Sequence, residues 1–245
     1  MNIILFEKDE LKDAHVILTD HRAKHIVKVL HSEPGDFIRV GEINGEIGKG
    51  KVLAIQSKYP FLVELSVSLS DKPVPPPPID LLLAMPRPIM FKRILSQVTA
   101  LGVGTIYLIN ANRVEKSFWD SGIINEEEYR PHLMHGLEQA VDTRLPQIKV
   151  FRHFRPFVEE YLPEINSQYS SLIIGHPDSA NTLSHCLSKN QGRVLYAVGP
   201  EGGWMDFEIE QFLAAGMRDF SIGARILKVD TAAVAIHGRI SQLLG

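Results

Sequence analysis

The chain has 245 residues, and 44% of them are hydrophobic, which is enough to bury the core of one large or two modest domains. Its net charge of −3 argues against a protein that coats nucleic acid without specificity, because such proteins carry a large basic excess. The single cysteine, Cys186, excludes an internal disulfide and a thiolate zinc cluster. The sequence contains no apolar run of membrane-spanning length and no secretory signal pattern, so we expect a cytoplasmic protein.

The first part of the chain is typical of a small β-barrel interrupted by one helix. Short β-rich runs are separated by turn residues such as Pro34-Gly35 and Asn44-Gly45. Asp20 is a suitable N-cap for a helix over residues 21–31, whose apolar residues recur at helical spacing and leave the basic side chains outside. The expected strands cover residues 3–6, 15–19, 37–41, 51–58 and 61–69.

A proline-rich segment, PVPPPP at residues 73–78, forms the clearest boundary in the chain. Proline fixes φ and removes backbone donors, so such a run makes a stiff, extended spacer. We therefore expect two domains, residues 1–72 and residues 79–245, joined by this linker.

After the linker, apolar strand-like runs alternate with helical segments, which is the pattern of a mostly parallel α/β sheet covered on both faces. Pro88 can open a helix that ends at Gly102. Asp206 can cap a second helix, and a third runs from about residue 231 to residue 244. The expected strands cover residues 79–86, 105–110, 148–154, 171–177, 193–200 and 219–223.

Three turn-rich loops follow consecutive strands in the last third of the chain, at residues 175–177, 199–203 and 223–230. Ligands of parallel α/β sheets bind beyond the carboxyl ends of the strands. A glycine-rich turn before a helix usually suggests phosphate, but Glu201 stands in the middle of this one, without the Lys, Ser or Thr of a P-loop. The loops therefore predict one composite pocket for a neutral or cationic ligand.

Two clusters of basic residues contrast with the near-neutral composition, one between His21 and His31 and the other between Arg87 and Lys116. Such patches suit a structured RNA site, although solvated helix faces give the same pattern. The residues that we expect to contact RNA are Arg22, Lys24, Lys28, Arg87, Arg93 and Arg113.

His21 and His25 have the i, i+4 spacing of a zinc-binding pair. The glutamate of an HExxH motif is absent, however, and the sequence offers no third ligand. We therefore expect no metal site.

Two segments, VGPEGGWMDFE at residues 198–208 and SIGARILKVDTA at residues 221–232, resemble the signatures of the SPOUT class of RNA methyltransferases. Three further segments extend the resemblance along the whole chain, to the ribosomal RNA small subunit methyltransferase E family, which methylates N3 of a uridine in 16S rRNA. These segments are HRAKHIVKVLHSEPGDFIRV, LAMPRPIMFKRILSQVTALGV and LEQAVDTRLP.

The resemblance implies a fold, a cofactor and partners. It implies a small PUA-like β-barrel that binds RNA, followed by a SPOUT α/β domain with a trefoil knot. It also implies S-adenosylmethionine as cofactor, and a homodimer acting on 16S rRNA or on the assembled small ribosomal subunit. Backbone groups of the three loops would hold the cofactor, at Gly175, Gly199, Gly202, Gly203, Ile222, Gly223, Ile226, Leu227 and Thr231.

Methylation at uridine N3 requires that a proton leave a poor nucleophile. We expect Arg225 or Arg144 to stabilise the uracil oxygens, and Asp230 or Glu201 to help remove the proton. A structural role is the alternative for both acids, with Asp230 capping the last helix and Glu201 bonding its own loop.

The chain departs from the family pattern at several motif positions. The usual RILRTETA reads RILKVDTA here, so Lys228 and Asp230 replace arginine and glutamate, and Trp204 replaces the usual phenylalanine. Lysine lacks the fork of donors of arginine, and aspartate has a shorter reach than glutamate. Any role that needs bidentate bonding or the longer side chain would therefore differ in this chain.

Two other classes of protein remain as alternatives. A nonenzymatic RNA-binding ribosome-assembly factor would use the barrel and the basic patches alone, and would not bind S-adenosylmethionine. A Rossmann-type oxidoreductase or small-molecule methyltransferase would place a glycine fingerprint after its first strand, where this chain has LLLAMPRP.

Overall fold

The computed structural model describes residues 2–73, 75, 77–187 and 192–245, so part of the expected linker at 73–78 lies outside the described residues. The chain forms two compact units. The first comprises Met1–Pro75 and Met134–Leu145, and the second comprises Pro76–Leu133 and Pro146–Gly245. The segment 134–145, which the sequence boundaries assign to the second domain, therefore packs with the first unit.

The first unit contains a five-stranded sheet in the order β1-β3-β4-β5-β2. All neighbours are antiparallel except β1 and β3, and β3 joins β4 through a tight turn at Asn44, whose φ is 59°. The Asn-Gly turn is thus where the sequence places it. The strands are β1 (Ile4–Phe6), β2 (His15–Leu18), β3 (Phe37–Glu42), β4 (Ile47–Gln56) and β5 (Leu62–Asp71).

Helix α1 (His21–Lys28) covers this sheet and begins as predicted, because the Asp20 side chain accepts a hydrogen bond from Arg22 N–H. The expectation that all its basic side chains point outward is wrong for Arg22. Its guanidinium donates to the carboxylates of Glu10 and Asp20, and also to the carbonyl of Leu5 at 2.8 Å. Leu5 belongs to β1, so Arg22 donates to a carbonyl of an edge strand. Within the described residues, the two edge strands β1 and β2 do not pair, so the sheet is not closed into a barrel.

Segment 134–145 joins the first unit through a small apolar cluster. Leu137 lies in the second half of α4 (Glu126–Ala140), and it is buried together with Ile3 and Leu5. The Thr143 hydroxyl donates to the carbonyl of Gly45 at 2.7 Å, which ties the end of the segment to the β3–β4 turn. Burial of these aliphatic side chains supplies the physical reason for the grouping.

The second unit contains a six-stranded sheet in the order β11-β9-β10-β6-β7-β8, and every neighbouring pair in it is parallel. The prediction of a parallel α/β sheet is therefore confirmed. The strands are β6 (Ile79–Ala84), β7 (Thr105–Ile109), β8 (Gln147–Phe151), β9 (Ser171–Gly175), β10 (Val194–Val198) and β11 (Arg218–Phe220).

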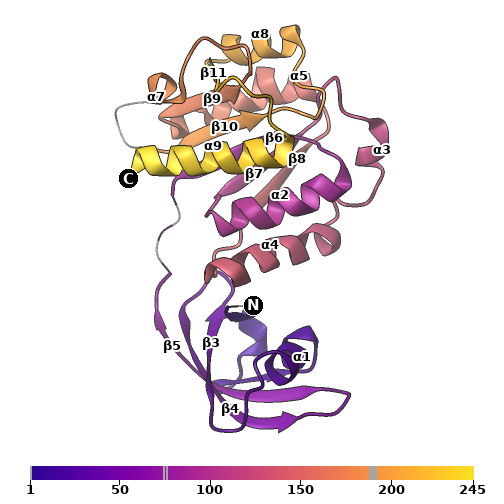
Figure 1. Cartoon of the computed structure of the whole chain (residues 1–245), viewed down its shortest axis with the longest axis vertical. Helices are drawn as coiled ribbons and strands as arrows, with labels where there is room; N and C mark the ends of the chain where they lie inside the picture. Colours follow the sequence, from indigo (N-terminus) through magenta and orange to yellow (C-terminus); the bar gives the residue numbers. More distant parts are fainter. Residues whose placement is uncertain (1, 74, 76, 188–191) are drawn as a thin grey trace. The chain divides into compact units, whose positions relative to one another are not determined.

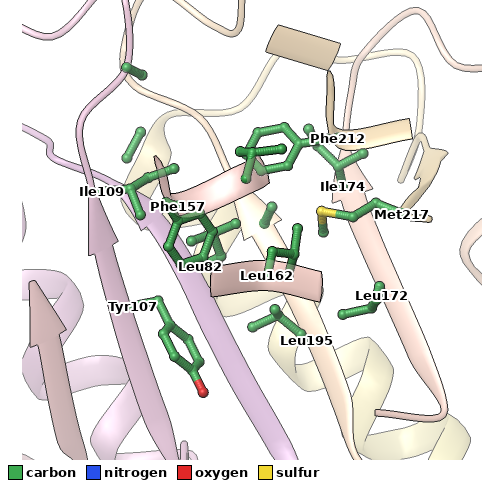
Figure 2. Packing of buried hydrophobic residues seen from close by; sticks show 14 of the residues in the cluster. Leu82, Tyr107, Ile109, Phe157, Leu162, Leu172, Ile174, Leu195, Phe212 and Met217 are labelled. Atoms are coloured by element: carbon green, nitrogen blue, oxygen red, sulfur yellow. The ribbon is translucent and has the colours of Figure 1, made fainter. Parts of the chain in front are cut away.

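Helices cover both faces of this sheet. On one face α2 (Pro88–Ala100) and α9 (Val229–Leu244) lie side by side, and α9 contacts β10 and β6 (Figure 1). On the other face Leu82, Phe157 and Phe212 converge in one hydrophobic cluster with other buried side chains (Figure 2). The elements of this second layer are α5 (Phe154–Pro156), the π-helical turn η2 (Phe157–Tyr161), α6 (Leu162–Ile165) and α8 (Asp206–Ala214).

The ends of two predicted helices show one agreement and one difference. Helix α2 starts at Pro88 and is followed by Gly102 with φ of 87°, as expected. Helix α8, however, has Met205 at its N-cap, and Asp206 is its first helical residue. The short elements outside the sheet are η1 (Lys8–Glu10), α3 (Lys116–Trp119), η3 (Asn166–Gln168) and α7 (Leu183–Cys186).

A buried histidine of α9 lies against the end of α2. His237 Nε2 lies 3.2 Å from the carbonyl oxygen of Leu101, and Nδ1 lies 3.4 Å from the hydroxyl of Tyr196. Burial lowers the pKa of His237 from 6.5 to about 4, against a smaller opposing effect of the Leu101 carbonyl. The folded state therefore holds this imidazole neutral.

We expect His237 to make folding sensitive to acid. Because its folded pKa is depressed, its contribution is fully present above pH 6.5 and is lost as the pH falls towards 4, at a total cost of about 3 kcal/mol. Urea unfolding at pH 7, 5.5 and 4.5 would measure this loss, and His237→Gln should remove it from the pH profile. If the wild-type protein and His237→Gln lost the same free energy of unfolding between pH 7 and pH 4.5, this assignment would be contradicted. His185→Gln, which changes an exposed histidine, serves as the matched control.

Candidate functional site

The three loops predicted to form the site lie at one edge of the second unit's sheet. They follow β9, β10 and β11, which are neighbouring parallel strands, so their carboxyl ends point to the same side. His176 N–H, just after β9, donates to the carbonyl of Phe220 at 2.9 Å, and Thr182 forms an isolated bridge with Ser221. The loops after β9 and β11 are thus hydrogen-bonded to each other.

The loop after β10 has a conformation that depends on its glycines. A Cβ on Gly199 would lie 3.0 Å from the Trp204 Nε1 atom, and Gly203 adopts a φ of 73° that glycine favours. The Trp204 ring packs edge-on against Phe212 at 5.1 Å between centroids. The glycines therefore allow this loop to fold tightly over Trp204, in addition to any space they leave for a ligand.

The Trp204 side chain is buried but not fully satisfied. Its residue is 5% exposed, and Nε1 has no hydrogen-bond partner among the residues that the structure describes. The phenylalanine that the family resemblance implies at this position would leave no donor there. The replacement therefore places an indole N–H against the backbone of Gly199.

Glu201 connects this loop to the end of β6 rather than bonding its own loop. Its Oε1 atom accepts a hydrogen bond from Arg87 N–H at 3.0 Å, and Arg87 is the N-cap residue of α2. The Arg113 guanidinium, from the loop after β7, donates to the carbonyl of Gly202. Residues from the ends of β6 and β7 therefore hold the glycine loop in place.

Glu208 supports the site in a way that the sequence analysis missed. This fully buried carboxylate accepts hydrogen bonds from Asn112 N–H at 2.7 Å and from Met205 N–H at 2.8 Å. It thereby closes the first turn of α8 and ties it to the loop after β7. The spacing of three residues between Met205 and Glu208 was the available signal, but Met205 does not look like a cap.

Asp230 lies in the first turn of α9, whose N-cap is Lys228, so Asp230 does not cap the helix. Its Oδ2 atom accepts a hydrogen bond from Arg93 at 3.0 Å, and Oδ1 accepts one from Thr231 N–H at 2.9 Å. Burial alone would raise the pKa of Asp230, but the Arg93 guanidinium and the Thr231 N–H hold it below its usual value. A carboxylate held in this way is a weak base.

The loop after β11 exposes both a cation and a large apolar side chain. Arg225 is exposed, and its side chain has no hydrogen bond or ion pair within the described part of the chain. Ile226 is 86% exposed, so core packing does not explain it. Ile222 and Gly223 line a cavity of about 480 Å³, together with Arg239 and residues 179–184.

The other residues predicted to bind cofactor or RNA, or to act in catalysis, are distributed over several elements of the two units. Gly175 lies at the end of β9, where a Cβ would be 3.3 Å from Ile236 Cδ1, and Thr231 is exposed in α9. Arg144 belongs to the first unit, and its guanidinium donates to the carbonyl of Pro73 at 2.9 Å. Lys24 and Lys28 are exposed on α1.

The described residues include no group of three or more His, Cys, Asp or Glu side chains placed to hold a metal ion. In the same part of the chain, no helix is long and apolar enough to cross a membrane.

Comparisons with known proteins identify two types of domain in the chain. A family model described as an RNA methyltransferase domain matches residues 73–241, and one described as an RNA methyltransferase PUA domain matches residues 18–65. The parallel sheet, its loop-lined edge and these two matches define an RNA methyltransferase with a PUA-type domain.

Two relatives narrow this class. The protein named Ribosomal RNA small subunit methyltransferase E of Treponema pallidum is 36% identical over 240 residues, which cover 96% of this chain and 88% of that protein. Ribosomal RNA small subunit methyltransferase E 1 of Borreliella burgdorferi is 28% identical over 236 residues, covering 96% of this chain and 95% of its own. The chain belongs to the ribosomal RNA small subunit methyltransferase E family, as the sequence motifs indicate.

A solved structure shares the fold. The crystal structure of a Ribosomal RNA small subunit methyltransferase E from Neisseria gonorrhoeae, bound to S-adenosyl methionine, superposes with a TM-score of 0.79 at 22% identity. The alignment covers 98% of each chain, so the likeness extends over the whole architecture.

Proposed function

We propose that this protein transfers a methyl group from S-adenosylmethionine to N3 of a specific uridine in the 16S rRNA of the small ribosomal subunit. Membership of the family and the named activity of its relatives support an RNA methyltransferase acting on small-subunit rRNA. The observation that carries the proposal is that the three family loops follow neighbouring parallel strands at one edge of the sheet, where the loops after β9 and β11 contact each other. An rRNA substrate also favours a cytoplasmic location.

The loops have the chemistry that this cofactor requires. S-adenosylmethionine carries a sulfonium and no phosphate, and it supplies the electrophilic methyl group. The loop after β10 places the carboxylate Glu201 where a phosphate would be repelled, and Ile226 leaves an apolar side chain open to cover a ligand. We propose that the cofactor is held by Gly175, Gly199, Gly202, Gly203, Ile222, Gly223, Ile226, Leu227 and Thr231.

The contacts of the charged residues favour one of the two arginines for catalysis. Arg225 is exposed on a site loop and has no protein acceptor among the described residues, whereas Arg144 donates to the Pro73 carbonyl in the first unit. We propose that Arg225 stabilises the negative charge that appears on the uracil oxygens when N3 loses its proton.

The two acids have structural partners, which favours positioning roles for both. Glu201 bonds Arg87 N–H, and Asp230 bonds Arg93, whose ion pair keeps the carboxylate a weak base. We propose that these pairs hold the site loops and leave the N3 proton to water. Arg87, Arg93 and Arg113 remain exposed near the loops and are proposed RNA contacts, with Lys24 and Lys28 in the first unit.

We also propose that the chain has the trefoil knot and the homodimeric state of its family. After the edge strand β11, the chain returns across the sheet to pack α9 against α2 and over β10 and β6, and this return path supports the proposed knot. The homodimer is proposed from the family alone, because the exposed apolar residues Ile89 and Leu243 lie at opposite ends of the α2–α9 pair and form no single patch.

Calorimetry with S-adenosylmethionine, followed by methylation of small subunits that lack the modification, tests the function. We expect saturable cofactor binding and one new methylated uridine, located by mass-spectrometric mapping of the 16S rRNA. S-adenosylhomocysteine should compete for the same site. Binding of rRNA without any cofactor binding would instead establish the nonenzymatic assembly factor.

A further inference from the structure

The sheet of the first unit carries a basic face that the expected RNA contacts do not include. In the β3–β4 ladder Phe37 stands opposite Lys51 and Arg39 stands opposite Lys49. In the β4–β5 ladder the same two lysines stand opposite Ser66 and Ser68. Three neighbouring strands therefore contribute to two adjacent cross-strand rows, Phe37–Lys51–Ser66 and Arg39–Lys49–Ser68.

The alternation of side chains along the strands separates these two rows from the core. Val40, Val52 and Leu65 occupy positions next to these residues in sequence, and all three are buried. Because successive side chains of a strand point to opposite faces, both rows lie on the outer face of the sheet. We call it the basic strand face, and it consists of Phe37, Arg39, Lys49, Lys51, Ser66 and Ser68.

Like charges stand opposite each other on this face. Cross-strand neighbours have Cβ atoms about 5 Å apart, and two cations so placed destabilise a sheet rather than support it. Within the described residues, Arg39, Lys49 and Lys51 form no ion pair, and the carboxylate Glu64 lies further along, opposite Ala54. Folding alone does not account for three uncompensated cations on adjoining strands, whereas a polyanionic ligand does.

An aromatic ring lies open beside these cations. Phe37 is 66% exposed, and its ring stacks on no other aromatic ring in the described part of the chain. A phenylalanine on the outer face of a sheet, next to lysine, gives a flat apolar surface on which a base can stack. The hydroxyls of Ser66 and Ser68 add neutral hydrogen-bonding groups across the next strand.

We propose that the basic strand face binds an unpaired stretch of the substrate RNA, with one base stacked on Phe37 and the phosphates beside Arg39, Lys49 and Lys51. An unpaired strand is favoured because a base can reach the Phe37 ring only when it is free of a duplex. This inference rests on the proposed function, since it assumes an RNA substrate. It adds a second RNA surface to the first unit, distinct from the exposed lysines of α1.

Fluorescence anisotropy with a fluorescent single-stranded RNA from the substrate region would test this surface across a salt series. For the triple variant Arg39→Ala, Lys49→Ala and Lys51→Ala, we expect the slope of log affinity against log salt to fall by about 2. Phe37→Ala should weaken binding by about 10-fold with an unchanged slope, because it removes stacking and no charge.

A matched triple variant, Lys8→Ala, Lys58→Ala and Lys72→Ala, removes the same charge from exposed positions outside the face. Its slope of log affinity against log salt should fall less than that of the first triple variant. Thermal unfolding and calorimetry with S-adenosylmethionine should show all variants folded and binding cofactor. Equal slopes for the two triple variants, or an unchanged affinity of Phe37→Ala, would overturn the inference. So would tighter binding of a duplex of the same sequence.

The same data separate this inference from the proposed function. If the wild-type protein methylates rRNA while the variants of the basic strand face bind RNA normally, only the inference that this face binds RNA fails. If the wild-type protein methylates no RNA, the proposed function itself fails.

Discussion

Replacing Arg225 with alanine is expected to slow methyl transfer by about 100- to 1,000-fold, which is the cost of losing one preorganised group that stabilises a developing anion. The loss should appear in kcat under single-turnover conditions, because the positive charge matters only once N3 has lost its proton. Affinity for S-adenosylmethionine should change little, since the exposed Arg225 side chain would face the RNA base. Calorimetry and quenched-flow methylation would measure the two effects separately.

Two further variants sharpen this prediction. Arg225→Lys keeps the charge but loses the planar fork, so it should recover only part of the rate. Arg218→Ala removes an exposed cation from β11 and should leave kcat near the wild-type value. The assignment would be contradicted if Asp230→Asn or Glu201→Gln abolished the rate while Arg225→Ala preserved it, because a carboxylate would then be the essential group.

Local patterns in the sequence predicted most of the architecture. The almost wholly apolar runs at β6 and β10 indicated strands covered on both faces, and both strands lie inside the parallel sheet. Asp20, Pro88 and Gly102 marked helix ends because their chemistry acts on the adjacent backbone. The position of the candidate site was predicted from one rule, that ligands of parallel sheets bind beyond the carboxyl ends of the strands.

Contacts between distant parts of the chain were not accessible in the same way. Arg22 resembles a surface cation, and its pairing with Glu10 and the Leu5 carbonyl appears only when β1 lies beside α1. Glu208 resembles an exposed helix residue, but Asn112 N–H reaches it from 96 residues away. Local spacing carries no record of such partners, so the charged residues were the least predictable part of the site.

The position of segment 134–145 illustrates the same limit. The proline run marks a change of composition, and composition says nothing about a segment that returns to the first unit later in the chain. Leu137 joins Ile3 and Leu5 because all three are apolar and close in space, and an apolar helix face does not specify its partner.

The second large effect is expected at Asp80, in a buried network at the amino end of the second unit's sheet. This carboxylate is 1% exposed, and it accepts hydrogen bonds of 2.6 Å from Arg193 Nε, from the Tyr169 hydroxyl and from Thr105 N–H. Gly104 leaves room for the pair, since a Cβ there would lie 2.7 Å from Asp80 Oδ1. Asp80 therefore joins β6, β7 and the segment that precedes β10.

Asp80→Ala should lower the free energy of unfolding by about 3 kcal/mol. The variant leaves Thr105 N–H and Tyr169 without their acceptor, while the Arg193 side chain is 39% exposed and regains water, which places the loss at the lower end of the range for broken buried pairs. Urea unfolding followed by circular dichroism would measure it, with Asp219→Ala as a control on a half-buried carboxylate of the same unit.

A double-mutant cycle with Arg193→Met identifies the source of that loss. If the ion pair carries it, the two single variants should each be strongly destabilised and the double variant should be less destabilised than their sum. Asp80→Asn keeps one acceptor oxygen and should fall between Asp80→Ala and the wild type. A loss below about 1 kcal/mol for Asp80→Ala would show that Thr105 and Tyr169 find other partners, because an unsatisfied buried donor alone costs about that much.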